Sequence, residues 1–313
     1  MKKLKYILLL LILLGAFVAK AQQETMYNMY MNQLLTMNPA YAGAKGVTSA
    51  AMLVREQLVG FKGHPSTQTI SVHSPLSDQT GIGGSIEVDR IGDVGAITRT
   101  TLSGDYSYTI TYPGERYLAL GLKIGTTSYY ATTSAVDVGS LGDMNDPQFL
   151  NDVKRPFLPN AGVGVYFSTP DYYLGFSTPK LISNRITVKD VETGTVSREE
   201  FHAFFMGGYV FDINRIVKFK PYFMVRMAMN SPMTIDLTAQ FVLIDRLWIG
   251  ATYRVQNSVG GLMQVQATDQ LKIGYSYDLM TTEVGQYNKG THEVFLSFDF
   301  SFGRGRVRSP RYF

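Results

Sequence analysis

Cysteine is absent from the 313-residue chain, and charged residues make up only 17% of it. Without cysteine the chain has neither disulfide bonds nor thiolate metal sites, so packing or lipid must stabilise its fold. The charged fraction lies below the roughly 25% that is usual in soluble domains. The chain is instead rich in glycine, tyrosine and phenylalanine, with 30, 20 and 18 residues. This composition favours a sheet that meets an apolar interface.

A short apolar run near the N-terminus indicates the compartment to which the chain is exported. Lys2, Lys3 and Lys5 precede the run from Ile7 to Val18, which ends in Ala19-Lys20-Ala21. The pattern predicts a cleavable secretory signal over residues 1–21, since the run is too short to span a membrane as a helix. We therefore expect an exported protein whose mature chain begins at residue 22.

Excess positive charge is absent once this segment is set aside. The whole chain has 29 basic and 25 acidic residues, and the signal segment holds four lysines and no acid. The remainder carries 25 residues of each sign and is close to neutral. Binding to phosphate backbones needs an excess of lysine and arginine, so we predict no nucleic-acid partner.

Helical periodicity is also absent from the mature chain, where apolar and polar residues alternate. Near the C-terminus, "EVFLSFDFSF" places Leu296, Phe298 and Phe300 on one face and Ser297, Asp299 and Ser301 on the other. Alternation over nine or more residues is typical of β-strands. The pattern predicts about fourteen strands, near residues 46–57, 66–74, 81–90, 96–112, 116–130, 160–168, 171–178, 201–212, 216–229, 233–243, 246–256, 259–266, 270–280 and 291–303.

The connections between these strands favour a transmembrane antiparallel β-barrel over a soluble β-sandwich. Every second connection is short, whereas long ones fall on the other side, at residues 58–66, 131–160, 180–200 and 281–290. Outer-membrane barrels have short periplasmic turns and long extracellular loops. The fold class we predict is therefore all-β, located in the outer membrane, with the last strand turning Leu296, Phe298 and Phe300 toward lipid.

The polar face of the strands supports the same fold. It is mostly Gly, Ser, Thr and Gln, whereas a soluble sheet would show water many Lys and Glu side chains. Charges of both signs are present, as expected if they pair across a lumen. These charged residues are Glu87, Asp89, Asp105, Lys123, Arg226, Asp236, Arg254, Lys272, Asp278 and Asp299.

No constellation of residues indicates catalysis or a bound metal. The four histidines, His64, His73, His202 and His292, show no HExxH or paired spacing, and no GxSxG motif occurs. The glycines of "TGIGGSIEV" lie in a strand and fit close packing better than a nucleotide site. We predict no enzyme activity, no cofactor and no metal. An outer-membrane hydrolase using His73 or His292 is a distant alternative.

The segment that opens the mature chain is not strand-like, and it holds the six residues Asn38-Pro39-Ala40-Tyr41-Ala42-Gly43. This motif resembles the signature of the PorP/SprF family, outer-membrane proteins of the type IX secretion and gliding machinery of Bacteroidetes. Further similarity covers nearly the whole mature chain, including "REQLVGF", "HSPL", "PNAGVGVYF" and "GQYNKGTHEVFLSFDF". The residues that carry the resemblance are Asn38, Pro39, Ala40, Tyr41, Gly43, Arg55, Gln57, Gly60, His73, Pro75, Asp89, Pro159 and Asn160.

The resemblance implies a barrel that works without catalysis. Family members support secretion, or hold the C-terminal domain of a large surface adhesin or other cargo at the outer membrane. Some are thought to contact other secretion components and periplasmic OmpA-like peptidoglycan-binding proteins. We expect the outer loops 131–160 and 180–200 to grip the cargo. An outer-membrane channel for small solutes is the main alternative.

These interpretations divide the chain into four parts. Residues 1–21 are the signal, 22–45 a non-barrel segment, 46–303 the barrel and 304–313 an arginine-rich tail. We expect the 22–45 segment to fold into the lumen or against the periplasmic mouth. The tail is expected to be a solvated periplasmic extension or a docking segment.

Overall fold

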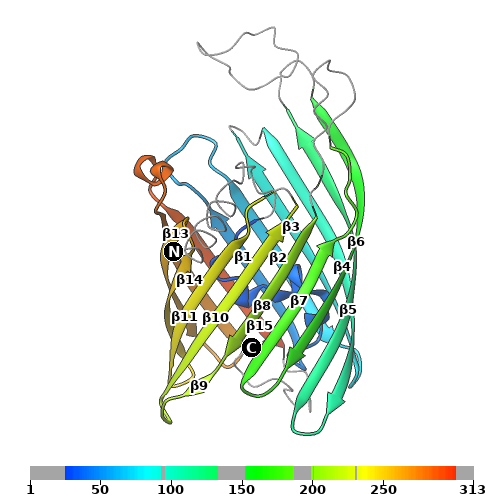
Figure 1. Cartoon of the computed structure of the whole chain (residues 1–313), viewed down its shortest axis with the longest axis vertical. Helices are drawn as coiled ribbons and strands as arrows, with labels where there is room; N and C mark the ends of the chain where they lie inside the picture. Colours follow the sequence, from blue (N-terminus) through cyan, green and yellow to red (C-terminus); the bar gives the residue numbers. More distant parts are fainter. Residues whose placement is uncertain are drawn as a thin grey trace, which may run out of the picture.

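The computed structural model describes residues 25–92, 96–132, 152–186, 199, 201–229 and 231–300, and its strands form one tilted, closed wall (Figure 1). Alternating apolar and polar residues suit strands that meet different surroundings on their two faces. The strands are β1 (Thr48–Glu56), β2 (Ser66–Pro75), β3 (Thr80–Ile91), β4 (Ile97–Tyr112), β5 (Arg116–Ala131), β6 (Val153–Ser168), β7 (Tyr172–Lys180), β8 (His202–Tyr209), β9 (Phe211–Asp212), β10 (Val217–Ala228), β11 (Thr234–Leu243), β12 (Leu247–Arg254), β13 (Ser258–Gln266), β14 (Leu271–Met280) and β15 (Thr291–Phe300).

The wall closes because the first strand pairs with the last. β1 pairs antiparallel with β15, and every other neighbour follows chain order up to the pairing of β10 with β11. β8 and β9 pair with successive parts of β10, so together they form one crossing that is interrupted at Val210. Within the described residues the fold is thus a 14-strand antiparallel barrel, the predicted fold class.

The two ends of the barrel differ in their connections. One end, here called the turn end, has connections of three or four residues at 76–79, 113–115, 169–171, 213–216, 244–246 and 267–270. The opposite end, the loop end, carries the long connections 57–65, 132–152, 181–201 and 281–290, besides three short ones. The predicted sorting of connections is therefore confirmed, with the exception of these three short loops.

Most strand positions agree with the predicted ranges, but β6 begins seven residues earlier than expected, at Val153. Pro156 and Pro159 interrupt the sequence pattern there, yet the stretch pairs with β5 through an irregularity beside Thr127. Proline in a strand is tolerated at such irregular places. The predicted residues 301–303 of the last strand lie outside the described residues. Among the described helices, none is long and apolar enough to cross a membrane.

The two faces of the wall have opposite chemistry. Leu296 is 39% exposed on the outer face, whereas Ser297 is 5% exposed and faces inward. The same alternation exposes Leu122 and Ile124 and buries Lys123 between them. An apolar outer band beside a polar interior is the arrangement that lipid demands of a barrel.

Several inward charges of the wall pair with a neighbouring strand, and not across the lumen as expected. Asp105 pairs with Lys123 on the adjacent strand, and Asp236 is held by Arg226 on β10 and Arg254 on β12. The lumen between opposite walls is filled by another part of the chain. Buried charges must find close partners, so they pair with the neighbouring strand.

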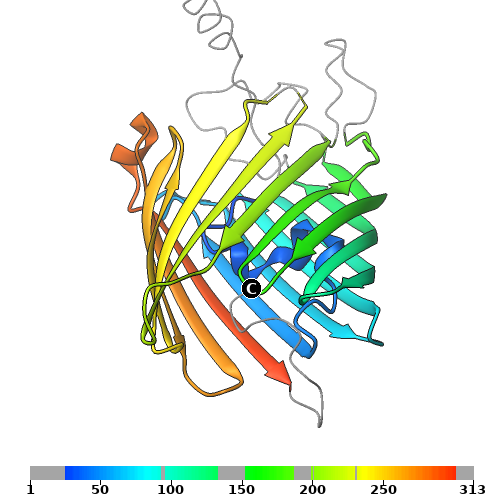
Figure 2. The same cartoon turned by 60° about the horizontal axis from the view of Figure 1, so that its bottom comes forward.

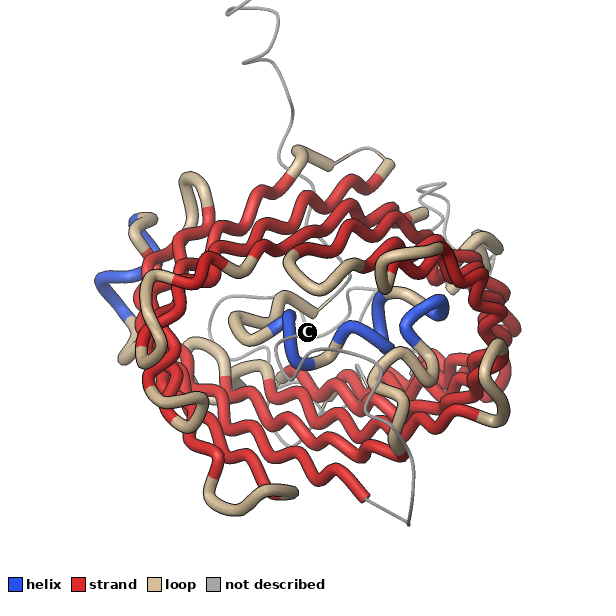
Figure 3. The backbone as a smooth tube through the Cα atoms, turned by 90° about the horizontal axis from the view of Figure 1, so that it is seen from below, coloured by secondary structure: helices blue, strands red, loops and turns tan. Residues whose placement is uncertain are grey.

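That filling is the luminal segment, defined here as residues 25–45, seen inside the ring of strands in Figures 2 and 3. It contains three short helical turns, η1 (Tyr30–Asn32), α2 (Leu34–Met37) and η2 (Pro39–Tyr41). Met29, Tyr30, Leu34, Leu35 and Ala40 are each 1% exposed or less. The main cluster of buried apolar residues therefore lies within the lumen, built around this segment.

Candidate functional site

The Asn38–Gly43 motif fixes the luminal segment to the wall. The Asn38 side chain accepts a hydrogen bond from the Ala40 amide at 3.0 Å, which caps η2, and Pro39 occupies the first turn. Its amide nitrogen also donates to the Val165 carbonyl of β6, again at 3.0 Å. One fully buried side chain thus shapes the turn and attaches it to the barrel.

Glycines of the wall let the motif come this close. A Cβ atom on Gly121 of β5 would lie 2.1 Å from the Ala40 nitrogen, and one on Gly164 of β6 would lie 2.1 Å from the Asn38 side-chain oxygen. Only a residue without a side chain fits at these contacts. Gly81, in the glycine stretch of β3, approaches the Ala42 carbonyl in the same way. Close packing against the barrel wall was expected of that stretch, and here the neighbour of Gly81 is the luminal segment.

The end of the motif is held by β2 and β4. Gly43 has a φ of +72°, which favours glycine, and lies against Pro75. Its amide donates to His73 Nδ1 at 3.2 Å, and the Ser107 hydroxyl donates to the Ala42 carbonyl at 2.6 Å. Here His73, named above as a candidate for hydrolase chemistry, is an acceptor for the backbone of the segment.

Tyr41 completes this attachment with its ring. It makes edge contacts with His73 and Tyr166, at centroid distances of 5.3 and 5.5 Å. Such edge-to-face pairs add to the free energy of burial. Burial raises the pKa of Tyr41 above its ordinary value, and the same holds for Tyr27 and Tyr30, so the segment presents neutral phenols to the lumen.

A second attachment joins the segment to the seam where the barrel closes. Arg55 of β1 and Glu293 of β15 are direct cross-strand partners and form a buried ion pair. The Glu293 carboxylate also accepts hydrogen bonds from the backbone N–H groups of Asn28 and Met29, at 2.6 and 3.0 Å. Asp278 lies 4.0 Å from Arg55. The same carboxylate therefore serves barrel closure and retention of the segment.

A third attachment lies at the start of the segment. The Thr25 hydroxyl donates to Asp89 at 2.9 Å, and Asp89 also accepts from Thr67 and Arg99. The Tyr27 hydroxyl donates to Glu87 at 2.5 Å. Together the three attachments involve strands from both sides of the closing seam.

The remaining candidate residues lie at the loop end, away from the motif. The Gln57 amide donates to the Pro65 carbonyl, and Gly60 adopts a φ of +108° beside Lys289. Pro159 and Asn160 hold the start of the 181–201 connection. The Asn184 side chain donates to the Pro159 carbonyl, and the Asn160 side chain exchanges two hydrogen bonds with the Ile182 backbone.

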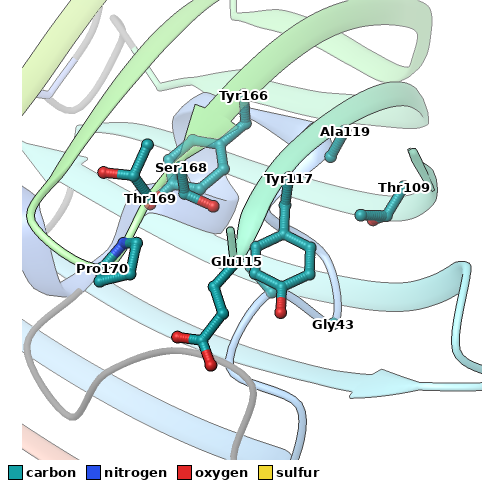
Figure 4. Close-up of a pocket in the computed structure, with 10 residues that line it drawn as sticks. Gly43, Thr109, Glu115, Tyr117, Ala119, Tyr166, Ser168, Thr169 and Pro170 are labelled. Carbon is teal, nitrogen blue, oxygen red and sulfur yellow. The ribbon is translucent and has the colours of Figure 1, made fainter. Parts of the chain in front are cut away.

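Two cavities lie beside the luminal segment near the turn end. The smaller, of about 40 Å³, lies beside Gly43 between Glu115, Tyr117 and Pro170 (Figure 4). It has room for a few water molecules. The larger, of about 360 Å³, lies against the inner face of β10 to β15, and its lining includes Lys45, Lys220, Gln240, Trp248, Gln264 and Lys272. The segment therefore packs closely on one part of the wall and leaves space at another.

The structure places His73 and His292 on opposite faces of the wall. His73 faces the luminal segment, whereas His292 accepts or donates a hydrogen bond with the Tyr275 hydroxyl at 2.7 Å on the outer face. Within the described ranges, no three His, Asp or Glu side chains gather as a metal site would require. The Asp143–Asp146 stretch and the arginine-rich tail lie outside the described residues.

Several residues of the site were missed from the sequence, above all Glu293 and Ser107. One signal was present: Leu53 and Phe295 are large apolar residues at inward positions, and they are direct partners across the seam. Leu53 is 0% and Phe295 is 2% exposed. Apolar side chains facing a lumen indicate that the lumen is filled at that level.

These features define an outer-membrane β-barrel protein whose lumen is occupied by its own N-terminal segment. The model of one family, described as type IX secretion system membrane protein PorP/SprF, matches residues 19–298. The chain belongs to this family. No curated protein matches its sequence.

The solved structures that resemble the chain are also membrane barrels. Omp33 of Acinetobacter baumannii is 9% identical with a TM-score of 0.46, covering 81% of this chain and 98% of its own. A FadL homologue of Pseudomonas aeruginosa is 13% identical with a TM-score of 0.47, covering 84% and 93%. A KdgM porin is 8% identical with a TM-score of 0.39, covering 80% and 99%. Similarities of this degree carry no information about function.

Proposed function

We propose that the protein is a non-enzymatic component of type IX secretion and gliding that anchors a cell-surface cargo, or helps to secrete it, through the cargo's C-terminal domain. The observation that supports this role is the occupied lumen. Three separate attachments hold residues 25–45 against the wall. A channel for small solutes would need that space, whereas an anchor needs only a stable barrel and exposed surfaces.

The surfaces expected to bind the cargo are the two long connections between β5 and β6 and between β7 and β8. We expect them to act together, because Asn160 of β6, the strand that follows the first connection, bonds to Ile182 at the base of the second. Periplasmic contacts with other secretion components or OmpA-like proteins belong to the turn end and the tail 304–313. The division into signal, luminal segment, barrel and tail remains part of this proposal.

The experiment is affinity purification of the tagged protein from gently solubilised outer membranes, followed by mass spectrometry. We expect to recover a large secreted protein. When a chemical cross-linker is added before solubilisation, we expect the cross-links to map to its C-terminal domain. A matched variant shortens the 132–152 connection to a glycine-serine linker and leaves the strands intact. Cargo that stays at the surface in normal amount in this variant, while the barrel is folded, would contradict the loop assignment.

Planar-bilayer conductance separates the proposal from the channel alternative. The purified protein is expected to show little steady ion current, because the luminal segment fills the barrel. A large, stable conductance in the unmodified protein, together with purification of the barrel alone, would favour the channel for small solutes.

A further inference from the structure

The larger cavity lies at the turn end of the barrel, where a binding site would be open to the periplasm. Its lining includes Ile244, Asp245 and Arg246 of one turn and Asp269 and Gln270 of another, all at the turn end. The side chains of Arg246 and Asp269 are 69% and 96% exposed, so solvent reaches the mouth. Short turns of outer-membrane barrels face the periplasm. A volume of about 360 Å³ is sufficient for a drug-sized ligand or a short peptide.

The charges of this cavity favour an anion. Its three lining carboxylates already bind cations: Asp299 pairs with Lys45, Asp245 with Lys218 and Asp269 with Arg246. Lys220 and Lys272 are two further basic residues of the same lining. Lys272 forms no ion pair with any described carboxylate, and its ammonium group lies 4.3 Å from the centroid of the Trp248 ring. The lining therefore has four basic side chains against three acidic ones.

Two hydrogen-bond donors of the lining add an independent observation. The Gln240 Nε2 and Asn32 Nδ2 atoms are buried and have no hydrogen-bond partner among the described residues. Buried polar groups in folded proteins almost always have a partner, so orphaned donors need an explanation. A carboxylate in the cavity would accept from Lys272, and from these amides once their side chains turn toward the cavity.

Aromatic and apolar groups make up the rest of the lining. They include Tyr173, Tyr222, Trp248 and Phe295 on the wall and Met31 and Leu34 on the luminal segment. Rings beside cations suit a ligand that joins a carboxylate to an apolar group, because each part finds its own partner. A simple inorganic anion would use only half of this surface.

We propose that this cavity binds a short acidic peptide segment of a periplasmic protein, with a Glu or Asp carboxylate at Lys272 and Gln240 and an adjacent apolar side chain against Trp248. The site deepens the periplasmic contacts proposed above for the turn end and rests on that part of the proposed function, but it is separate from the anchoring role at the loop end. It would bind whether or not a cargo is engaged outside.

The test uses Trp248, because it is the single tryptophan of the chain and lies in the cavity. The full-length protein in detergent is titrated with the peptide acetyl-Phe-Glu-Phe-amide, and tryptophan emission is followed with excitation near the red edge. The matched control peptide is acetyl-Phe-Gln-Phe-amide. We expect saturable binding of the acidic peptide, weaker binding of the control, and loss of affinity at high salt.

Lys272→Gln is expected to weaken binding of the acidic peptide about tenfold, as the loss of one charge-assisted hydrogen bond implies. Lys220→Gln should weaken it as well. The matched control Lys289→Gln removes a positive charge at the exposed loop end and should leave the affinity unchanged. Heat-dependent mobility in gels verifies that each barrel is folded.

Any of the following results would overturn the proposal. One is the absence of any saturable change in Trp248 emission in the folded protein. The second is equal affinity for the two peptides, or an unchanged affinity in both lysine variants. The third is equal binding of acetate at the same carboxylate concentration, because the apolar part of the peptide would then contribute nothing.

Discussion

Two parts of the barrel wall differ in how closely they pack against the luminal segment. β3 to β7 meet it with glycines, and backbone packs against backbone at Gly121 and Gly81. β10 to β14 meet it with Lys220, Gln240 and Lys272, and the cavity of about 360 Å³ remains between them. Glycine gives close contact and a fixed position, whereas long polar side chains hold the segment at a distance. The first part attaches the segment, and the second keeps an accessible space beside it.

The closing seam is the strongest place to test this comparison. Glu293→Gln leaves Arg55 buried beside a neutral amide, and removing one member of a buried ion pair costs about 3–5 kcal/mol. We expect this variant to lose more barrel stability than any of those that follow, measured by thermal unfolding in detergent. Asp269→Asn, in an exposed pair of 3.9 Å, is the control and should change nothing measurable. Similar losses in both would mean that the seam pair does not have a special role.

The glycine part of the wall is tested next by Gly121→Val. The new side chain would collide with the Ala40 backbone, so we expect displacement of the luminal segment and a loss of about 3 kcal/mol. Ion conductance in planar bilayers should rise at the same time. The matched control is Gly104→Val on β4, where a Cβ meets nothing closer than 4.0 Å. A folded Gly121→Val protein without conductance would show that other attachments suffice.

Asn38→Ala tests how much one side chain contributes to the attachment of the luminal segment. It removes both the cap of η2 and the bond to the Val165 carbonyl, and we expect a loss of about 1–2 kcal/mol in unfolding experiments. Asn38→Asp keeps the acceptor for the cap, but it buries a carboxylate with no partner and turns one of its oxygens toward the Val165 carbonyl. It should therefore destabilise the barrel more than alanine does. An Asn38→Asp protein more stable than Asn38→Ala would argue that the bond to Val165 contributes little.

The polar part of the wall should be the most tolerant. Lys218→Gln breaks the ion pair with Asp245 at the edge of the cavity, where the aspartate side chain is 40% exposed. Pairs of this kind contribute about 0.2–1 kcal/mol. We expect only a small change in thermal unfolding. A loss as large as that of Glu293→Gln would remove the distinction between the two parts of the wall.

The sequence predicts the wall better than its contents. Alternation such as that around Lys123 reflects lipid on one side and the lumen on the other, so the strands are visible in one chain. The luminal segment has no period, because its positions are decided by contacts with many different strands. Nothing local links Arg55 to Glu293, since their pairing depends on the register of the closing seam. The family resemblance identified Asn38 and Tyr41, but their contacts needed the fold.

The order of synthesis gives the seam a further meaning. Asn28 is among the first residues of the described chain to be made, and it bonds to Glu293, which is 265 positions later. Contacts this distant in sequence form late in folding and slowly. The luminal segment therefore completes its attachments only after the last strand has joined the barrel. The Arg55–Glu293 pair forms only when the barrel closes, and the same Glu293 carboxylate then binds the luminal segment. Barrel closure and attachment of the segment are therefore coupled.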